Sequence, residues 1–352
     1  MPIYDDYNMI TNKNSFDILN DEKLNKSFLS ATLNDIDINC KIYKGNFYAD
    51  SFNYFPITED FEVFHDLYKI QNENSINHFY SNNFAENLKK NITNLKKFNN
   101  VYLLGSSPGD NYFSNLIYFL PRLFFYNQDK IKLAIHRNLS NKFRNFINEI
   151  CSNLNKKITF TFLDDKFYNF IDSYSPQFLR IEESIKILKF FLNNYQDEVA
   201  EKTKIYITRQ NSNYRKILNE SDVIKLFKQN NFQIINPYNY EIKEQINLFS
   251  KADIVVSPTG SNLANIIFCK KGTKIYEIAP NFKHSYEDNL SIRYQKISEI
   301  NDLDYCKIKV DSVDVKTHSK IAEKYISKKV LEESSYYKNL IVKISDLTKY
   351  LN

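Results

Sequence analysis

Hydrophobic and polar positions follow two different periods along the chain, and the change of period predicts where strands and helices lie. Short runs of β-branched and aromatic residues indicate strands, and longer stretches with an apolar residue every three or four positions indicate helices. One such stretch covers residues 181–194. Its apolar side chains fall on one face of the predicted helix: Ile185, Leu188, Phe191 and Leu192. From about residue 100 the two kinds of element alternate, which predicts a parallel sheet covered by helices.

The alternation forms two cycles that meet near residues 196–203. In the first cycle, strands are predicted at 101–104, 131–135 and 158–163, and helices at 112–126, 140–154 and 181–194. In the second cycle, strands are predicted at 204–208, 232–235, 254–257, 274–278 and 305–310. Helices are predicted at 220–230, 243–250, 263–268 and 287–297, the first of them capped by Asn219 or Ser221. The stretch 322–351 also has a helical pattern.

Residues 1–85 lack this regularity. Two strand-like pieces, 36–43 and 46–55, flank the pair Lys44-Gly45, which predicts a hairpin. The predicted architecture is therefore α/β. It has an irregular, β-containing region over 1–85 and two Rossmann-like domains over 86–198 and 199–352, which we expect to face each other across a cleft.

Composition narrows the class of protein. With 43% hydrophobic and 15% aromatic residues among 352, the chain can build real cores, so wholesale disorder is excluded. The net charge of +5 arises from interspersed basic and acidic residues. That balance does not suggest a nucleic-acid-binding protein, although it slightly favours anionic ligands.

Cysteine and histidine spacing gives no sign of a metal site or a disulfide framework. The four cysteines are far apart and form no CxxC pair: Cys40, Cys151, Cys269 and Cys306. The five histidines lack ligand spacing: His65, His78, His136, His284 and His318. The first residues show no secretory signal, and no apolar run approaches the roughly 20 residues that span a bilayer. These features predict a cytoplasmic protein.

Glycine is scarce, and four of the five glycines lie in two segments that resemble ligand-binding turns. Gly105 and Gly109 follow the first predicted strand, and Gly260 and Gly272 bracket the segment after the strand 254–257. The second segment has the order strand, sharp turn, helix. This arrangement directs backbone N–H groups at a ligand above the helix start, and it suits a phosphate or diphosphate.

Candidate anion-binding side chains gather at the carboxyl ends of the strands in the second cycle. Arginine binds phosphate oxygens bidentately, short polar side chains donate hydrogen bonds, and a carboxylate can accept two ribose hydroxyls. The predicted donor-binding residues are Arg209, Arg215, Thr259, Gly260, Ser261, Asn262 and Glu277. Simpler alternatives are surface arginines, a helix N-cap at the turn and a solvated carboxylate.

The first cycle offers Asp110 as a general base beside Gly109, with Asn111 and His136 as further residues of a cleft or acceptor site. Asp110 could equally cap the helix that begins near Asn111. His136 follows a predicted strand end, and a structural role is the simpler interpretation of it. The acidic pair Asp164-Asp165 is predicted to be a solvated turn.

The order and spacing of the motifs resemble glycosyltransferase family 61, which includes capsular-polysaccharide enzymes of bacteria. The second half carries the resemblance most clearly, through Arg209 with Arg215-Lys-Ile-Leu-Asn-Glu220, the turn 258–268 and the segment 272–280. The first half is similar to a second signature of the family, at 111–113 and at Leu120-Pro-Arg-Leu123. Together the resemblance spans about residues 100 to 310.

The resemblance implies a GT-B glycosyltransferase that transfers a sugar from a UDP-sugar to a glycan or glycolipid acceptor of a capsule or lipopolysaccharide. It further implies that the configuration of the anomeric carbon is inverted and that no metal or other cofactor is needed. The protein is expected in the bacterial cytoplasm, extending to the inner face of the membrane. Thr259, however, occupies a position where the family usually has histidine, and Ser261-Asn262 replace Ala-Gly. Ser114-Asn115 replace His-Trp, and Tyr118 a frequent Asp. These departures leave a non-catalytic nucleotide- or glycan-binding homologue as the alternative. A dehydrogenase is not favoured, because no G-x-G-x-x-G follows a strand.

Overall fold

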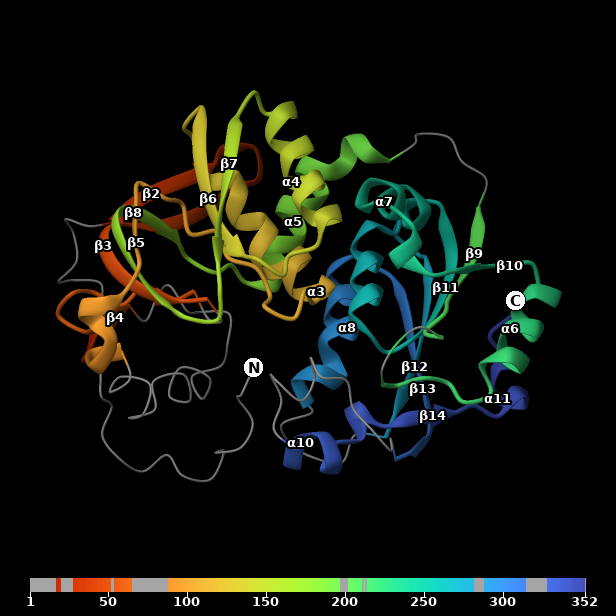
Figure 1. Cartoon of the computed structure of the whole chain (residues 1–352). Coiled ribbons are helices and arrows are strands. Elements are labelled where there is room, and N and C mark those ends of the chain that lie inside the picture. Colours follow the sequence, from red (N-terminus) through yellow and green to blue (C-terminus); the bar gives the residue numbers. More distant parts are fainter. Residues whose placement is uncertain are drawn as a thin grey trace. The chain divides into compact units, whose positions relative to one another are not determined.

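The computed structural model describes residues 17–19, 28–51, 54–64, 88–196, 202–210, 212, 214–281, 288–314 and 328–351. The chain divides into two compact units, Asp6–Phe190 and Phe191–Asn352. Both combine helices and strands, so the α/β class is confirmed (Figure 1). Within the described residues, no helix is both long enough and apolar enough to cross a lipid bilayer.

The unit Asp6–Phe190 is built on a mixed sheet. Four strands lie in the order β2 (Phe28–Leu33), β3 (Ile38–Asp50), β8 (Phe167–Pro176) and β5 (Lys97–Asn99). Strand β3 is antiparallel to both of its neighbours, whereas β5 is parallel to β8. Two short strands, β1 (Asp17–Leu19) and β4 (Glu62–Phe64), pair separately. This unit is therefore not a wholly parallel, doubly wound sheet.

The segment 101–105 joins this sheet to a parallel pair of strands. Tyr102 bridges to β8 on one side and to β6 (Lys130–His136) on the other, and β6 pairs in parallel with β7 (Lys157–Leu163). Helix α4 (Asn141–Asn153) connects β6 to β7, and α5 (Ile181–Leu192) follows β8. The strands and the helix predicted over 131–163 are therefore present, whereas the predicted strand 101–104 is reduced to bridges at Tyr102.

Two predictions for this unit need correction. Lys44 and Gly45 do not form a hairpin. They lie inside the single strand β3, which is irregular between Gly45 and Phe47 and continues along β8 on both sides. The predicted helix 112–126 is helical but irregular. It passes through α3 (Tyr112–Ser114), a π-helical turn η5 (Asn115–Phe119) and a 3₁₀ stretch η6 (Leu120–Phe125).

The unit Phe191–Asn352 has a six-stranded sheet in the order β10-β9-β11-β12-β13-β14. The first five strands are parallel: β10 (Phe232–Ile235), β9 (Thr203–Ile207), β11 (Ala252–Pro258), β12 (Lys274–Pro280) and β13 (Asp304–Val313). By sequence their order is second, first, third, fourth, fifth, a doubly wound arrangement whose order reverses between β9 and β11. The parallel sheet predicted for this half is confirmed.

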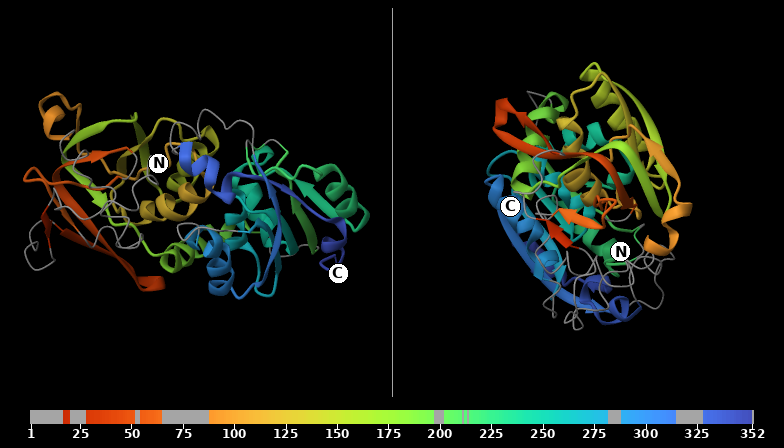
Figure 2. Two further views of the ribbon diagram at one scale, coloured as in Figure 1. Left: turned by 90° about the horizontal axis from the view of Figure 1, so that it is seen from below. Right: turned by 90° about the vertical axis from the view of Figure 1, so that its left-hand side faces the viewer.

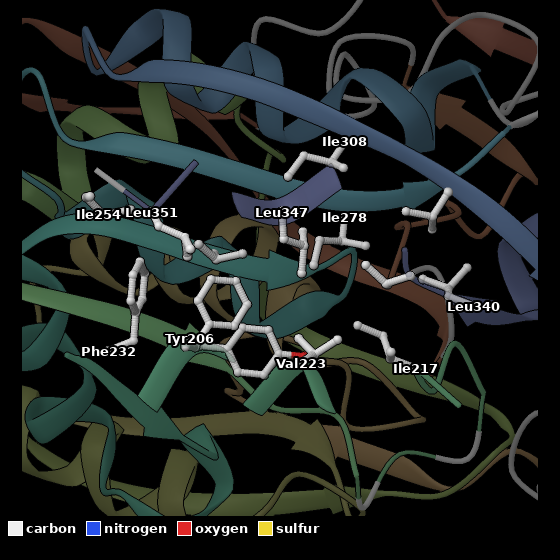
Figure 3. Close-up of a cluster of buried hydrophobic side chains, with 14 residues drawn as sticks. Tyr206, Ile217, Val223, Phe232, Ile254, Ile278, Ile308, Leu340, Leu347 and Leu351 are labelled. Atoms are coloured by element: carbon white, nitrogen blue, oxygen red, sulfur yellow. The ribbon is translucent and has the colours of Figure 1, made fainter. Parts of the chain in front are cut away.

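Helices cover both faces of this sheet (Figure 1). Helices α6 (Glu220–Gln229) and α11 (Ile344–Thr348) lie on one face, where Val223, Phe227 and Leu347 enter a buried cluster with Tyr206 and Ile278 (Figure 3). Helix α7 (Ile242–Ser250), the 3₁₀ helix η9 (Ser261–Phe268) and α8 (Asp288–Ile300) follow β10, β11 and β12 and pack against one another, α7 and α8 each on η9. The residues 263–268, predicted as an α-helix, thus belong to a 3₁₀ helix.

The C-terminal stretch differs from the predicted helix. Its described residues contain α10 (Lys328–Glu333), the 3₁₀ turn η11 (Ser335–Tyr337), β14 (Asn339–Ile341) and α11. Strand β14 is antiparallel to β13 and extends the sheet at its edge, where the two strands lie beside each other (Figure 2). This pairing covers the last three residues of β13, Asp311–Val313.

Candidate functional site

Two chain segments that the sequence marks as ligand-binding meet in the unit Phe191–Asn352. Arg209 follows the carboxyl end of β9, and Gly260 follows that of β11. Because the strand order reverses between β9 and β11, a crevice is expected above their carboxyl ends, where ligands of open α/β sheets bind. The two candidate residues therefore lie at the position in the sheet that favours a ligand site.

The side chain of Arg209 lies directly against the backbone of Gly260. A Cβ atom added to Gly260 would fall 2.0 Å from Nη1 and 3.1 Å from Cζ of Arg209. The φ angle of Gly260 is 173°, an extended conformation that any residue can adopt. Glycine is thus needed here for space, because its missing side chain admits the guanidinium of Arg209.

A buried carboxylate fixes the backbone of Arg209. Oε1 of Glu220 accepts a hydrogen bond from N of Arg209 at 2.9 Å and from the hydroxyl of Tyr206 at 2.8 Å. Glu220 is only 4% exposed, although it starts α6. The sequence pattern gives Glu220 no role in the site, and this positioning role was therefore missed. Its place eleven residues after Arg209 and at a helix start was the only signal.

The loop after Arg209 carries a second arginine, Arg215, which is buried. Nη2 of Arg209 donates to the carbonyl of Tyr214 at 3.1 Å. The guanidinium carbons of Arg209 and Arg215 lie 6.0 and 5.0 Å from the centre of the Tyr214 ring. Arg215 is 2% exposed and has a φ angle of 55°, which is unusual for a residue with a side chain. Strained backbone of this kind clusters at functional sites.

The turn after β11 is fixed from three sides. Thr259 donates its backbone N–H to Ile278 on β12 at 2.8 Å, and Gly260 accepts from N of Leu263 at 2.9 Å and from the hydroxyl of Tyr294. Thr259 is fully buried, Asn262 is buried and Ser261 is half-buried. Of the polar residues predicted for this turn, Ser261 is therefore the most accessible to a ligand.

Glu277 occupies a different environment from the one its sequence position suggested. It pairs with Ser257 inside β12, three residues before the strand ends, and it is fully buried. The hydroxyl of Tyr305 donates to Oε2. Burial raises the pKa of Glu277 above its ordinary value of 4.5, whereas the Thr259 side chain, the Tyr305 hydroxyl and the positive charges of Lys307 and Arg293 lower it in part.

Asp110, the predicted base, lies in the unit Asp6–Phe190 and is held by its neighbours. Its Oδ1 accepts from Nδ2 of Asn115 at 2.9 Å and from N of Ser140, the N-cap residue of α4, at 3.2 Å. Burial raises the pKa of Asp110, and the bonds from Ser140 and Asn115 oppose that rise. The helix that begins at Tyr112 is instead capped by the side chain of Asn111, which accepts from N of Ser114.

His136 is buried at the end of β6, and both ring nitrogens have partners. Nδ1 accepts from N of Asn138 at 3.1 Å, so Nε2 carries the proton and donates to Asp165 at 2.9 Å. The adjacent Asp164 pairs with Arg137. Both carboxylates of the acidic pair are partly exposed, and each also has a basic partner. The other four histidines lie outside the described residues.

The arginine of the Leu-Pro-Arg segment is a structural residue. Arg122 is fully buried and donates to the carbonyls of Leu104 and Pro176 at 2.6 and 2.7 Å, with its guanidinium 4.1 Å from the centre of the Phe178 ring. Burial lowers the pKa of Arg122 to about 10. This side chain ties the segment 101–105 to the end of β8 and does not reach solvent.

Potential metal ligands do not gather in the part of the chain that the structure describes, where no group of three or more His, Cys, Asp or Glu side chains could hold an ion. The four cysteines, all among the described residues, form no disulfide.

Comparison with known proteins bears on the second unit most directly. Residues 172–276 match the model of the family described as glycosyltransferase 61, a span that is less than a third of the chain. No curated protein matches the sequence. The family match covers Arg209, Arg215, Glu220 and Gly260 and ends one residue before Glu277, and the first signature at 111–123 lies outside it. The match supports the glycosyltransferase 61 family, and with it a glycosyltransferase, as the class of protein to which these motifs point.

Proposed function

We propose that this chain transfers a sugar from a nucleotide-sugar donor, a UDP-sugar by its resemblance, to a glycan or glycolipid acceptor of a surface polysaccharide. The observation that carries the proposal is the guanidinium of Arg209 seated against Gly260 at the point where the strand order reverses. A cation held at a turn between a strand end and a helix start is suited to a diphosphate, because the guanidinium and the backbone N–H groups of the turn can both bind phosphate oxygens.

In the proposed reaction, an acceptor hydroxyl oxygen forms a bond to the anomeric carbon of the donor sugar while the bond from that carbon to the diphosphate breaks. The electron pair of the broken bond leaves with the nucleoside diphosphate, and the proton of the hydroxyl passes to a general base. Arg209 stabilises the negative charge that develops on the leaving diphosphate. Arg215, buried behind Tyr214, adds positive potential to the same loop. No step requires a metal ion.

Asp110 is the proposed base for this step, with inversion at the anomeric carbon. The raised pKa of its carboxyl supports the proposal, because a base works best when its pKa lies near the working pH. We further propose that the two units adopt the GT-B arrangement and that the protein works in the cytoplasm, extending to the inner face of the membrane. Its proposed partners are the nucleotide-sugar and the acceptor glycan, and no nucleic acid.

The test of the donor site is calorimetric titration with UDP. Replacing Arg209 with Ala should weaken UDP binding by about 1.5–3 kcal/mol, the usual range for a hydrogen bond to a charged group. Unchanged UDP affinity in that variant would remove Arg209 from the site. A panel of nucleotide sugars, screened for protection against thermal unfolding, would then identify the donor.

A non-catalytic homologue that binds nucleotide or glycan is the alternative function. It is favoured by the bonds that already occupy the candidate bases, since Oδ1 of Asp110 accepts two hydrogen bonds and both nitrogens of His136 are engaged. Failure of the unsubstituted protein to transfer sugar across a broad donor and acceptor panel, with UDP still bound, would select this alternative.

A further inference from the structure

Residues 337–342, the C-terminal strap, lie beside residues 214–219, the donor loop, although more than one hundred residues separate them in the sequence. The two segments pair in parallel at Ile217 and Leu340. N of Leu218 donates to the carbonyl of Leu340, and N of Leu340 donates to the carbonyl of Lys216, both at 2.8 Å. The donor loop is thus attached to β14, at the edge of the sheet, by an isolated parallel bridge.

Side chains strengthen this pairing at both ends. Oδ1 of Asn339 accepts from N of Lys216 at 3.0 Å. Asn219 forms two bonds with the backbone of Val342, since its Nδ2 donates to the carbonyl at 2.7 Å and its Oδ1 accepts from the N–H at 3.1 Å. Asn219 is the N-cap residue of α6, yet its side chain makes no capping bond there. Its side-chain amide instead bonds the backbone of Val342 in the strap.

The strap itself is anchored to the rest of the unit. It pairs antiparallel with β13, where Ser312 lies opposite Leu340. Leu340 and Val342 are buried in the same hydrophobic cluster as Ile217, and Figure 3 shows Ile217 and Leu340 next to each other in it. Such anchoring means that the strap can restrict the loop rather than move with it.

A continuous set of contacts leads from the strap to the donor arginine. The ring of Tyr337 meets the ring of Tyr214 edge to face, with centroids 5.3 Å apart. The carbonyl of Tyr214 in turn accepts from Nη2 of Arg209, whose guanidinium lies against Gly260. A loop that was not held would leave this carbonyl, and the guanidinium bonded to it, without a fixed position.

We infer that the C-terminal strap positions Arg209, and so the proposed donor site, through its bonds to the donor loop. The inference rests on the proposed function, and it extends the site beyond the residues matched by the family model, which end at 276. Asn339 and Asn219 are the positioning residues through which the strap acts.

The experiment measures UDP affinity by calorimetry in Asn339→Ala, Asn339→Asp and Asn219→Ala. Loss of one or two hydrogen bonds from the loop should weaken UDP binding roughly 2- to 10-fold in the two alanine variants. Asn339→Asp retains the acceptor oxygen and should restore affinity to near that of the unsubstituted protein. Hydrogen exchange should show faster exchange of the Lys216 and Leu218 amides in Asn339→Ala.

Leu351→Ala is the matched control. Leu351 is buried in the same cluster and lies on the same C-terminal segment, but its carbonyl accepts from Nζ of Lys204 on β9 at 2.9 Å rather than from the donor loop. Its replacement should lower the melting temperature and leave UDP affinity unchanged. If the unsubstituted protein binds UDP and all three asparagine variants bind it with the same affinity, the role of the strap is overturned and the donor assignment stands. Failure of the unsubstituted protein to bind UDP would overturn the donor assignment, and the strap's role in it.

Discussion

At the scale of single residues, glycine is needed at Gly260 and at Gly272 for different physical reasons. Gly260 has extended backbone but no room for a side chain beside Arg209, whereas Gly272 has open space around it and a φ angle of 79°. The first constraint concerns the position of an arginine. The second concerns backbone strain, which costs about 1–2 kcal/mol for residues with a side chain.

The two glycines therefore predict opposite outcomes for the same substitution. Gly260→Ala should displace the flexible guanidinium of Arg209 and weaken UDP binding about as much as removing that arginine, while the melting temperature changes little. Gly272→Ala should lower the free energy of unfolding by about 1–2 kcal/mol and leave UDP affinity intact. Calorimetry and urea unfolding on both variants check the pair. Loss of stability without loss of affinity in Gly260→Ala would contradict the proposed contact.

Glu277 predicts a pH dependence of stability. Because burial raises its pKa in the folded state, its favourable contribution is fully present below the ordinary value of 4.5 and is lost as the pH rises through the folded-state pKa. In Glu277→Gln this stability is not lost with rising pH, because the glutamine side chain does not ionise. The variant should therefore gain stability relative to the unsubstituted protein as the pH rises from 4.5, by about 1.4 kcal/mol for each unit of upward pKa shift. Urea unfolding at several pH values measures it, and a difference that does not change with pH would contradict the assignment.

At the scale of elements, the sequence pattern located most of the parallel strands and their helices but not the antiparallel pairings. Strands β9 to β13 are short runs of β-branched and aromatic residues, which local pattern identifies. Strand β14 was predicted as helix because its partner β13 lies far away in sequence and no periodicity records that pairing. Lys44-Gly45 looked like a turn for the same reason, since only the long partner β8 keeps β3 extended through it.

In the candidate site too, local features could be predicted from the sequence and tertiary contacts could not. Residues at strand ends, such as Arg209 and Gly260, could be identified because the carboxyl ends of parallel strands share one edge. Glu220 and Asn219 could not be identified, since their roles depend on tertiary hydrogen bonds that the sequence pattern of a helix start does not indicate. The depth of Glu277 was equally hidden, because the sequence does not reveal how far β12 continues past it.

Asp110 bonds the N-cap residue of α4 and is also the proposed general base, and a substitution can separate these two roles. Asparagine at this position keeps a carbonyl oxygen that can accept from Asn115 and Ser140, so the turn should remain attached to α4. It cannot take a proton from an acceptor hydroxyl. Asp110→Asn should therefore cut turnover by roughly 10²–10⁴-fold while UDP affinity and melting temperature change little. Near-normal turnover would show that another residue deprotonates the acceptor, His136 being the next to test.

At the scale of the whole molecule, two arginines supply positive charge at the proposed donor site, and the carboxylate of Glu220 that bonds the Arg209 backbone is buried. Arg209 and Arg215 follow β9 in the second unit, and Lys307 and Arg293 are near enough to Glu277 to lower its pKa. In the other unit, Asp164 and Asp165 are already engaged by Arg137 and His136. Fixed cations of this kind can replace a metal ion in stabilising a leaving diphosphate.

The last prediction follows from this distribution of charge. UDP affinity and sugar transfer should survive dialysis against EDTA, because arginine rather than a divalent ion compensates the diphosphate. UDP affinity should instead fall as sodium chloride is raised, since salt screens the attraction between accessible charges. Transfer assays and calorimetry, with and without EDTA, measure both effects. If activity disappears in EDTA and returns with Mn²⁺ or Mg²⁺, the metal-free mechanism is wrong. Asp164→Asn and Asp165→Asn would then show whether this acidic pair, released from its basic partners, binds the ion.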